Sequence, residues 1–485
     1  MPFNTPAFFG FFIIFYLIYL GLRRYLKLQN IWLLLASYIF YGLFSWRFLP
    51  ILVFMTVSDY CLSLLIGKLA VDKSGGRIIR KLLISLSIVI DLGILIFLKY
   101  LDFFAPEFSH VLELVGISAD PITKNIILPV GISFYVLKSL SYVLDVYRRR
   151  QTPIRNILEY AIFVAYFPAL LAGPIDRARK LLPQIHQPRW ITSSQFAAGL
   201  TLILWGYFKK LVIADNVANI ANQVFAPGGN VQGLDVLLGT LAFALQIYGD
   251  FSGYSDIARG FSHLIGFELM INFKLPYFAL NPADFWQRWH ISLSEWLRDY
   301  VFFPLRRMLL TWHIQPIALW GLLVPPMVTM LVSGMWHGTG LNFLIWGLYH
   351  GVLMIVYRLF GSMPVSKQLN TIITSRLGVL FRILVMFSFV CLGWIFFRAT
   401  SVSQAFQLIT RLSFTPSGQS ISYIQDLLFL GLPLLFVQIW QTIKGDMLVL
   451  AKLRFPLQLV ANLLLLVWII VFGAHGALEF IYSQF

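Results

Sequence analysis

The sequence predicts an all-α, polytopic membrane protein, and three observations support this fold class. Of its 485 residues, 59% are hydrophobic and only 12% are charged, and the mean hydropathy is +0.78. Apolar runs recur along the whole chain, and about 20 mostly apolar residues form a helix long enough to cross the hydrocarbon layer. The alternation with period two that marks a membrane barrel is absent. We therefore expect roughly 10 to 13 membrane helices in a single membrane-embedded domain over residues 1–485.

Eight apolar runs give the main elements in chain order. The first is followed by Arg23, Arg24 and Lys27 and not by a small-residue cleavage site, which predicts a retained helix rather than a removed signal peptide. Several runs are shorter than a full crossing, so we expect some of them to be re-entrant. The runs cover residues 8–20, 31–48, 82–98, 126–136, 234–247, 341–356, 383–397 and 457–472, and a proline at position 50 breaks the stretch 31–66.

The basic residues predict the topology. The net charge is 37 − 21 = +16, and the positive residues lie in short loops between apolar runs. Cytoplasmic loops are enriched in Lys and Arg, so membrane topology explains the charge better than nucleic-acid binding does. Residues 102–124 hold four carboxylates and one lysine, which predicts a loop on the outer side, whereas Arg148 to Arg150 predict a return to the cytoplasm. This is the pattern of a multi-pass membrane protein.

The middle of the chain departs from simple crossings. The apolar segment 161–172 is short and has basic residues on both sides, and Lys209 and Lys210 interrupt the next apolar run. Irregular backbone at membrane depth is tolerated where protein surrounds it or where it lines a cavity. We therefore expect re-entrant or protein-buried segments around a central cavity.

The two cysteines, Cys61 and Cys391, both lie in apolar runs, and we interpret them as buried structural thiols. Their spacing gives no disulfide framework and no set of metal ligands. No zinc-ligand cluster, phosphate-binding glycine loop or nucleophile-elbow serine occurs either. The sequence therefore predicts no metal site.

Two polar clusters separated by one apolar segment are the most informative part of the chain. The stretch 286–304 reads WQRWHISLSEWLRDYVFFP, and residues 333–340 read SGMWHGTG. Ionisable groups inside a membrane are costly, and each is a candidate functional residue. An imidazole titrates near neutral pH and can take a proton from a hydroxyl and return it to a leaving group. His290 and His337 are therefore the predicted catalytic residues.

Each candidate also has a structural interpretation. His337 follows a segment bent by two prolines and has glycines around it, which favours the catalytic role over a histidine that only packs in the core. His290 falls near one helical stripe with Trp286 and Trp289, so a substrate-orienting role and a structural role stay equally open. His350 we interpret as a histidine of helix packing. The candidates for a substrate channel are Trp289, Trp336, Arg288 and Asp250, although helix capping or pairing with Arg259 also accounts for Asp250.

The C-terminal sequence FIYSQF, residues 480–485, is the third informative place. Aromatic side chains anchor proteins at the membrane interface, which is one explanation of this tail. The other is that the tail enters the protein's own cavity and presents Tyr482.

Long motifs resemble the bacterial membrane-bound O-acyltransferase family, in the branch of the alginate O-acetyltransferase membrane subunit. They include QIYGDFSGYSDIARG (246–260), LNPADFWQRWHISLSEWLRDYVFFPL (280–305), SGMWHG and the FIYSQF ending, and they cover nearly the whole chain. The resemblance implies that His337 is catalytic and that His290 is a second functional position. Related systems that add D-alanine to teichoic acids carry an aromatic tail with a tyrosine on a small partner, which makes Tyr482 a candidate acyl carrier. Arg306 and Arg307 depart from the pattern, since a glycine-rich turn is expected there.

The resemblance implies an O-acetyltransferase of the bacterial inner membrane. The expected donor is acetyl-CoA, a thioester on the cytoplasmic side, and the expected acceptor is a hydroxyl of an exported polysaccharide or of a periplasmic relay protein. Expected partners are membrane lipid and periplasmic acetyltransferase or other polymer-modifying proteins, with no nucleic acid. Two alternatives stay open: transfer of D-alanine or another acyl group to a cell-envelope polymer, and a transporter or flippase whose histidines relay protons.

Overall fold

The computed structural model describes residues 3–69, 74–114, 129–229, 231–312, 317–361 and 367–474. Helices and turns make up these residues, with a single isolated bridge between Gly233 and Leu412. Among them, nine stretches are long and apolar enough to cross a membrane. The predicted all-α, polytopic fold class is confirmed. The chain divides into two compact units, Met1–Phe196 with Phe261–Leu269, and Ala197–Gly260 with Met270–Phe485.

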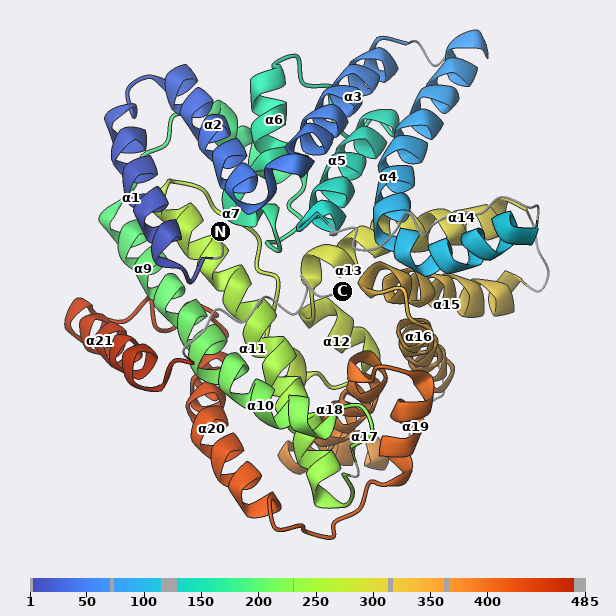
Figure 1. Cartoon of the computed structure of the whole chain (residues 1–485), viewed down its shortest axis with the longest axis vertical. Helices are drawn as coiled ribbons and strands as arrows, with labels where there is room; N and C mark the ends of the chain where they lie inside the picture. Colours follow the sequence, from blue (N-terminus) through green and yellow to red (C-terminus); the bar gives the residue numbers. More distant parts are fainter. Residues whose placement is uncertain are drawn as a thin grey trace. The chain divides into compact units, whose positions relative to one another are not determined.

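The first unit is a set of helices at the N-terminal end of the chain (Figure 1). Thr5 caps its first helix by accepting a hydrogen bond from the Phe8 amide, and Pro6 occupies the first helical position, where no amide hydrogen is needed. The elements are α1 (Pro6–Gly21), α2 (Leu26–Ser45), η1 (Trp46–Phe48), α3 (Leu49–Lys68), α4 (Ser74–Leu114), α5 (Ile132–Tyr147), α6 (Ile157–Ala165), α7 (Phe167–Leu170) and α8 (Ala178–His186).

Four expectations can be compared with the structure, three for this unit and one for the two cysteines of the chain. The predicted break at Pro50 lies just before it, in η1, and Pro50 stands in the first turn of α3. Helix α4 continues to Leu114, so residues 102–114 are helical and not part of a loop, while 115–128 lie outside the described residues. Residues 161–172 are all buried, which fits protein-buried backbone. Cys61 is exposed and Cys391 is buried, so the prediction of two buried thiols is wrong for Cys61.

A buried carboxylate ties three helices of the first unit together. Asp59 of α3 is fully buried and accepts hydrogen bonds from Ser87 of α4, at 2.8 Å, and from Ser139 of α5. Ser139 is also hydrogen-bonded to the Tyr160 hydroxyl of α6, at 2.7 Å. Helices in lipid gain little from apolar packing alone, so interhelical hydrogen bonds of this kind help fix their arrangement.

The second unit holds the polar clusters singled out in the sequence. A stretch of π-helix interrupts its first long helix, at the predicted Lys209 and Lys210. The elements are α9 (Ser193–Tyr207), η2 (Phe208–Ala214), α10 (Asp215–Val224), α11 (Leu234–Leu264), η3 (Pro276–Phe278), α12 (Pro282–Arg288), α13 (Ile291–Leu297), η4 (Arg298–Phe302), α14 (Phe303–Thr311), α15 (Ile317–His337), α16 (Leu341–Gly361), α17 (Lys367–Thr374), α18 (Arg376–Arg398), α19 (Val402–Thr410), α20 (Ser420–Lys444) and α21 (Phe455–Phe472).

Two glycines let α15 and α16 pack backbone to backbone. A Cβ at Gly334 would lie 2.3 Å from the Phe343 carbonyl oxygen, and one at Gly347 would lie 2.4 Å from the Met330 carbonyl oxygen. Small residues are the usual means of such close approach between membrane helices. The pair positions the end of α15, where His337 lies.

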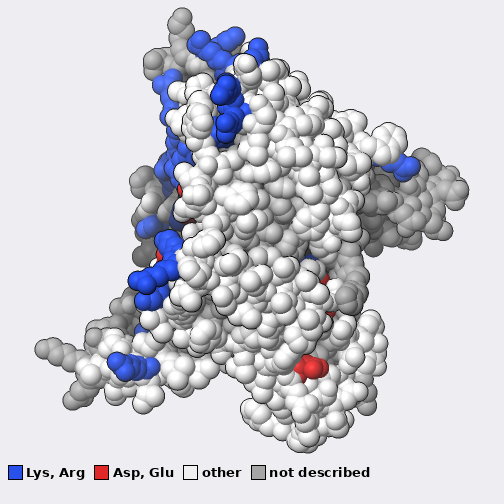
Figure 2. All heavy atoms as spheres, turned by 90° about the vertical axis from the view of Figure 1, so that its left-hand side faces the viewer, with Lys and Arg blue, Asp and Glu red and all other residues white. Residues whose placement is uncertain are grey.

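The surface is mainly apolar. Helix α21 exposes Leu464 at 57% and Ile470 at 65%, and α1 exposes Leu17 at 66%. On the face shown in Figure 2 most atoms belong to uncharged residues, and Lys and Arg side chains occur in separate groups. Exposed apolar surface of this extent suits contact with lipid rather than with water.

Candidate active site

The stretch 286–304 is not a single helix. Helix α12 ends at Arg288, α13 begins at Ile291, and His290 between them has φ 42° and ψ 54°. This left-handed conformation is uncommon for residues other than glycine, although histidine adopts it more readily than most. The expected single stripe of Trp286, Trp289 and His290 is therefore wrong, because the chain turns at the histidine.

The turn at His290 is held by hydrogen bonds on both sides. The imidazole Nδ1 accepts a hydrogen bond from the Leu293 amide at 3.4 Å, so the side chain caps α13. Because Nδ1 accepts, the neutral ring carries its proton on Nε2. The buried Asn272 completes the turn: its carbonyl oxygen accepts from the Ile291 amide at 2.9 Å, and its side chain accepts from the Ser292 hydroxyl at 2.9 Å. The capping role of Nδ1 thus leaves Nε2 as the protonated nitrogen of the ring.

His290 is kept neutral by its surroundings. Its side chain is 1% exposed, and burial lowers its pKa from 6.5 to about 3. The ring lies edge-on to Phe251, with centroids 4.6 Å apart, and 5.7 Å from the ring centroid of Trp336. At physiological pH this imidazole is a hydrogen-bond donor through Nε2 and carries no charge.

His337 is the last residue of α15 and lies in an aromatic cage. Its ring centroid is 4.9 Å from that of Trp336, 5.1 Å from that of Trp346 and 5.2 Å from that of Phe397. The side chain is 2% exposed. His337 thus lies in a buried aromatic site at the carbonyl end of α15.

Trp336 brings the two predicted histidines into one cluster. Both His290 and His337 make edge-to-face contacts with it, at interplanar angles of 79° and 80°. The positions of His290, Trp336 and His337 depend on α13, α15 and the close packing of α15 against α16. Of the four predicted substrate-channel residues, Trp336 is the one that contacts both histidines.

The other channel candidates make different contacts. Trp289 is buried against Trp394, with ring centroids 4.9 Å apart. Arg288 is 30% exposed and forms an ion pair with Asp284 at 2.6 Å. Asp250 lies in mid-helix and pairs with Lys210 at 2.5 Å, so neither capping nor Arg259 accounts for it. Tyr482, the candidate acyl carrier, lies outside the described residues.

Sequence reasoning missed the second half of the aromatic cage. Trp346 contacts both His337 and His350, with centroids 5.1 Å and 4.9 Å away, and Phe397 reaches His337 from α18. A local signal existed for Trp346, since it precedes His350 by four residues and therefore shares its helix face. Phe397 had no such signal, because only the tertiary packing of α18 brings it to the site.

His350 is buried in the same cluster. It is 1% exposed, and neither ring nitrogen has a hydrogen-bond partner within the described residues. Its ring packs edge-on against Trp286 at 5.1 Å and lies parallel to Phe285 at 6.1 Å. A Cβ at Gly393 would lie 2.9 Å from its Nε2, so α18 approaches closely only because a glycine stands there. These contacts fit the packing role expected of His350.

Residues 33–396 match the family model of the membrane-bound O-acyltransferases. The chain belongs to this family. An enzyme that transfers acyl groups to hydroxyls uses a general base, and a caged histidine beside a neutral histidine donor suits that chemistry. Membership also contradicts the alternative of a non-enzymatic transporter or flippase. In the described residues, no three His, Cys, Asp or Glu side chains converge as metal ligands.

Three relatives of this chain differ in the polymer that their names give. The probable alginate O-acetylase AlgI of Azotobacter vinelandii is 38% identical over 81% of this chain and 73% of its own length. The peptidoglycan O-acetyltransferase of Helicobacter pylori is 32% identical over 84% and 79%. The teichoic acid D-alanyltransferase of Bacillus subtilis is 31% identical over 56% and 69%. The protein is thus an O-acyltransferase and a multi-pass bacterial membrane protein.

Proposed function

We propose that the protein is an O-acetyltransferase that passes an acetyl group from a cytoplasmic thioester, acetyl-CoA, to a hydroxyl of an exported polysaccharide or of a periplasmic relay protein. The observation that carries the proposal is the position of His337, caged by aromatic rings at the end of α15 beside His290. Two relatives, one named as a probable alginate O-acetylase and one as a peptidoglycan O-acetyltransferase, support the acetyl group and the class of acceptor.

His337 acts as the general base. It takes the proton of the attacking hydroxyl, whose oxygen forms a bond to the thioester carbonyl carbon. The tetrahedral adduct collapses, the carbon–sulfur bond breaks, and the proton passes from His337 to the departing thiolate. The products are an oxygen ester and a free thiol, so the base is regenerated and no oxidant or reductant is needed. The surrounding rings of Trp336, Trp346 and Phe397 exclude water, which limits hydrolysis of the thioester.

His290 stabilises the adduct. Its neutral ring presents an Nε2–H donor, because Nδ1 is engaged with the Leu293 amide. A fixed neutral donor in a buried site strengthens its hydrogen bond as negative charge develops on the carbonyl oxygen. Trp336 contacts both rings and lines the substrate channel between them. Trp289, Arg288 and Asp250 stay predicted members of that channel.

Tyr482 serves as the acyl carrier in this scheme. A phenol has a pKa near 10, well below that of a sugar hydroxyl, so an acetyl phenyl ester can pass its acyl group on to a sugar. His337 would deprotonate the Tyr482 hydroxyl in the first step, and the resulting ester would react with the acceptor in the second. The aromatic residues around Tyr482 in the tail sequence, Phe480 and Phe485, would hold it in an apolar channel.

The test is a reconstituted transfer reaction. Purified full-length protein in liposomes receives acetyl-CoA labelled in the acetyl group, and the label is followed into protein and into added polysaccharide, while a thiol reagent measures release of coenzyme A. Acetyl transfer that depends on His337 supports the proposal. Transfer from a D-alanyl thioester of a carrier protein, with none from acetyl-CoA, would instead favour the D-alanine alternative that the B. subtilis relative suggests.

A further inference from the structure

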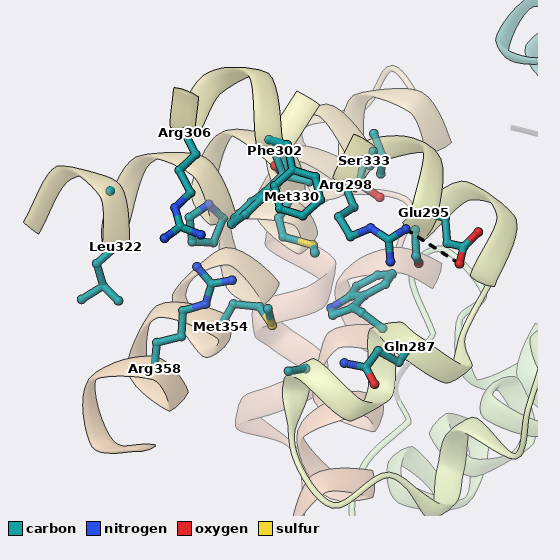
Figure 3. Close-up of a pocket in the computed structure, with 18 of the residues that line it drawn as sticks. Gln287, Glu295, Arg298, Phe302, Arg306, Leu322, Met330, Ser333, Met354 and Arg358 are labelled. Carbon is teal, nitrogen blue, oxygen red and sulfur yellow. Dashed lines mark ion pairs between the residues drawn. The ribbon is translucent and has the colours of Figure 1, made fainter. Parts of the chain in front are cut away.

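A second feature of the Ala197–Gly260/Met270–Phe485 unit is a pocket bordered by arginines. It has a volume of about 930 Å³ and lies among α12, α13, η4, α14, α15 and α16. Figure 3 shows Arg306 of α14 and Arg358 of α16 converging in it. Arg306 is one of the two residues at which this chain departs from the glycine-rich turn that its resemblance to the family implies. The acyl-transfer scheme uses neither arginine.

The two arginines have no carboxylate partner among the described residues. The pocket's one carboxylate, Glu295, pairs with Arg298 at 3.8 Å, and Arg298 also pairs with Asp299 at 3.1 Å. The guanidinium of Arg358 lies over the Phe302 ring, 5.1 Å from its centroid, and is close enough to Arg306 to be repelled by it. Two like charges that face each other repel, and an anion bound between them relieves the repulsion.

The chemistry of the arginines points to phosphate. A guanidinium is planar and offers several donors in a fixed fork, which matches the oxygens of a phosphate group, and stacking on an aromatic ring fixes its plane. Phe302 supplies such a ring for Arg358. The pocket therefore has a preformed basic end suited to a phosphate monoester or diester.

The remainder of the pocket is mainly apolar and borders exposed apolar side chains. Leu309, Met330 and Met354 line its interior. At its rim, Phe303 is 45% exposed and Leu310 is 51% exposed. Arg358 stands in the last turn of a candidate membrane span, and Trp312, 64% exposed, follows the end of α14, as expected of a helix end at the membrane interface.

From these contacts we infer that the pocket binds an anionic phospholipid, with the headgroup phosphate between Arg306 and Arg358 and an acyl chain along Leu309, Met330 and Met354. The phosphates of the thioester donor could also bind the arginines. The polar remainder of the donor would then contact the apolar wall and the exposed apolar rim, which is unfavourable. A lipid accounts for both ends of the pocket. The site goes beyond acyl transfer, and its test does not depend on that activity.

The experiment measures lipid binding by the full-length protein in a nonionic detergent after removal of native lipid. Short-chain phosphatidylglycerol is the probe, and binding is followed by thermophoresis or native mass spectrometry. Charge-assisted hydrogen bonds are strong enough that Arg306→Gln and Arg358→Gln should each weaken binding by about tenfold or more. Arg358→Lys should fall between, because it keeps the charge but loses the planar fork.

Arg307→Gln is the matched control. Arg307 is the neighbouring residue on the same helix, is exposed and does not line the pocket. If the lipid is held by the arginines of the pocket, Arg307→Gln should bind it within about twofold of wild type. Equal weakening by Arg307→Gln would mean that the lipid responds to surface charge alone and would overturn the site. Arg306 is exposed and has no ion pair among the described residues, so Arg306→Gln should fold normally. This variant keeps the test decisive even if Arg358→Gln fails to fold.

A second arm replaces the lipid with coenzyme A. We expect coenzyme A not to compete with phosphatidylglycerol for this pocket. If coenzyme A displaces the lipid and its own binding is lost in Arg306→Gln and Arg358→Gln, the pocket receives the phosphates of the donor, and the lipid assignment is wrong. Wild-type lipid binding by the Arg306→Gln/Arg358→Gln double variant would overturn the inference as well.

Discussion

The imidazole of His337 meets the indole of Trp346 edge-on, with ring centroids 5.1 Å apart and ring planes at 88°. The contact joins the last residue of α15 to the second turn of α16, across a helix pair that glycines bring together. It fixes the direction of an imidazole that the scheme uses as a base. A small shift between these two helices therefore changes the reach of the catalytic nitrogen, and effective catalysis requires such geometry to be held closely.

The first prediction concerns His337. His337→Ala should lower acetyl transfer by roughly 10²- to 10⁴-fold, the usual contribution of a general base, while the protein still inserts and remains monodisperse in detergent. The control is His186→Ala, since His186 is 76% exposed and belongs to the other unit. Transfer should be unchanged in that variant. Near-normal transfer by well-expressed His337→Ala protein would exclude His337 as the base.

The second prediction separates two roles of His290. Asparagine tolerates a left-handed backbone and caps helices well, so His290→Asn should keep the turn and the cap while losing the Nε2–H donor. We expect reduced transfer with a melting temperature close to wild type, and a smaller loss of transfer than in His337→Ala. His290→Ala should lose both the cap and the activity. If His290→Asn transfers acetyl at the wild-type rate, the role of His290 is structural.

The lowered pKa of His290 also predicts acid sensitivity. Between pH 6.5 and about 3 the unfolded imidazole binds a proton that the folded one does not. Stability is therefore complete above pH 6.5 and falls as pH decreases, by about 1.4 kcal/mol per pH unit for this group. His290→Asn should show a shallower decline of melting temperature between pH 6.5 and 5 than wild type. Parallel declines would show that His290 is not held neutral in the folded protein.

The repeated apolar runs were enough to predict the fold class, because crossing a membrane requires long apolar helices whatever their tertiary arrangement. The ends of individual helices were harder to predict from the sequence. Both Pro50 and His290 mark places where the chain turns, yet the break near Pro50 lies in the preceding residues, and a histidine in a left-handed turn carries no reliable sequence signal. Helix α4 runs to Leu114, and Glu107 and Glu113 near its end are good helix formers.

The site was partly visible in the sequence. Polar residues inside apolar surroundings identified His290 and His337, and the structure brings both against Trp336. What could not be predicted was the wall supplied by α18, since Phe397 reaches His337 only through tertiary packing. Asp250 was predicted as a channel residue for the same reason as the histidines, because it is polar within apolar surroundings. Its partner, Lys210, was predicted only to interrupt an apolar run.

The third prediction tests the topology with cysteine labelling. In a Cys61→Ser background, which removes the exposed native thiol, a maleimide that cannot cross membranes should modify Ser109→Cys from outside intact spheroplasts but not Thr152→Cys. Loops rich in Lys and Arg stay in the cytoplasm, and Thr152 follows Arg148 to Arg150. Permeabilised cells provide the control, in which Thr152→Cys should react. The reverse pattern in intact spheroplasts would invert the proposed sides of donor and acceptor.

The fourth prediction concerns Tyr482. Tyr482→Phe keeps the aromatic ring and removes only the hydroxyl, so it should abolish transfer to the acceptor if Tyr482 is the carrier. Ser483→Ala is the matched control, because it removes the neighbouring hydroxyl and should leave transfer unchanged. Mass spectrometry of the C-terminal peptide should find an acetyl group on Tyr482 in wild type supplied with donor alone. Wild-type transfer by Tyr482→Phe would leave the tail only an anchoring role.

The last prediction concerns the buried ion pairs at the π-helix η2. The ammonium of Lys210 lies 2.8 Å from a carboxylate oxygen of Asp215 and 2.5 Å from one of Asp250, and all three side chains are at least 96% buried. Removing the cation takes the charge of Lys210 away from two buried carboxylates, and breaking a buried pair in this way typically costs about 3–5 kcal/mol.

Lys210→Met should therefore lower the melting temperature strongly or prevent recovery of folded protein, whereas Lys452→Met should have little effect. Lys452 pairs with Asp446 at 2.5 Å but is 64% exposed, and exposed pairs contribute little to stability. The triple variant Lys210→Met/Asp215→Asn/Asp250→Asn should recover part of the loss, because it leaves no uncompensated charge in the core. If Lys210→Met melts like wild type, water or another cation replaces the ammonium, and the π-helix does not depend on this network.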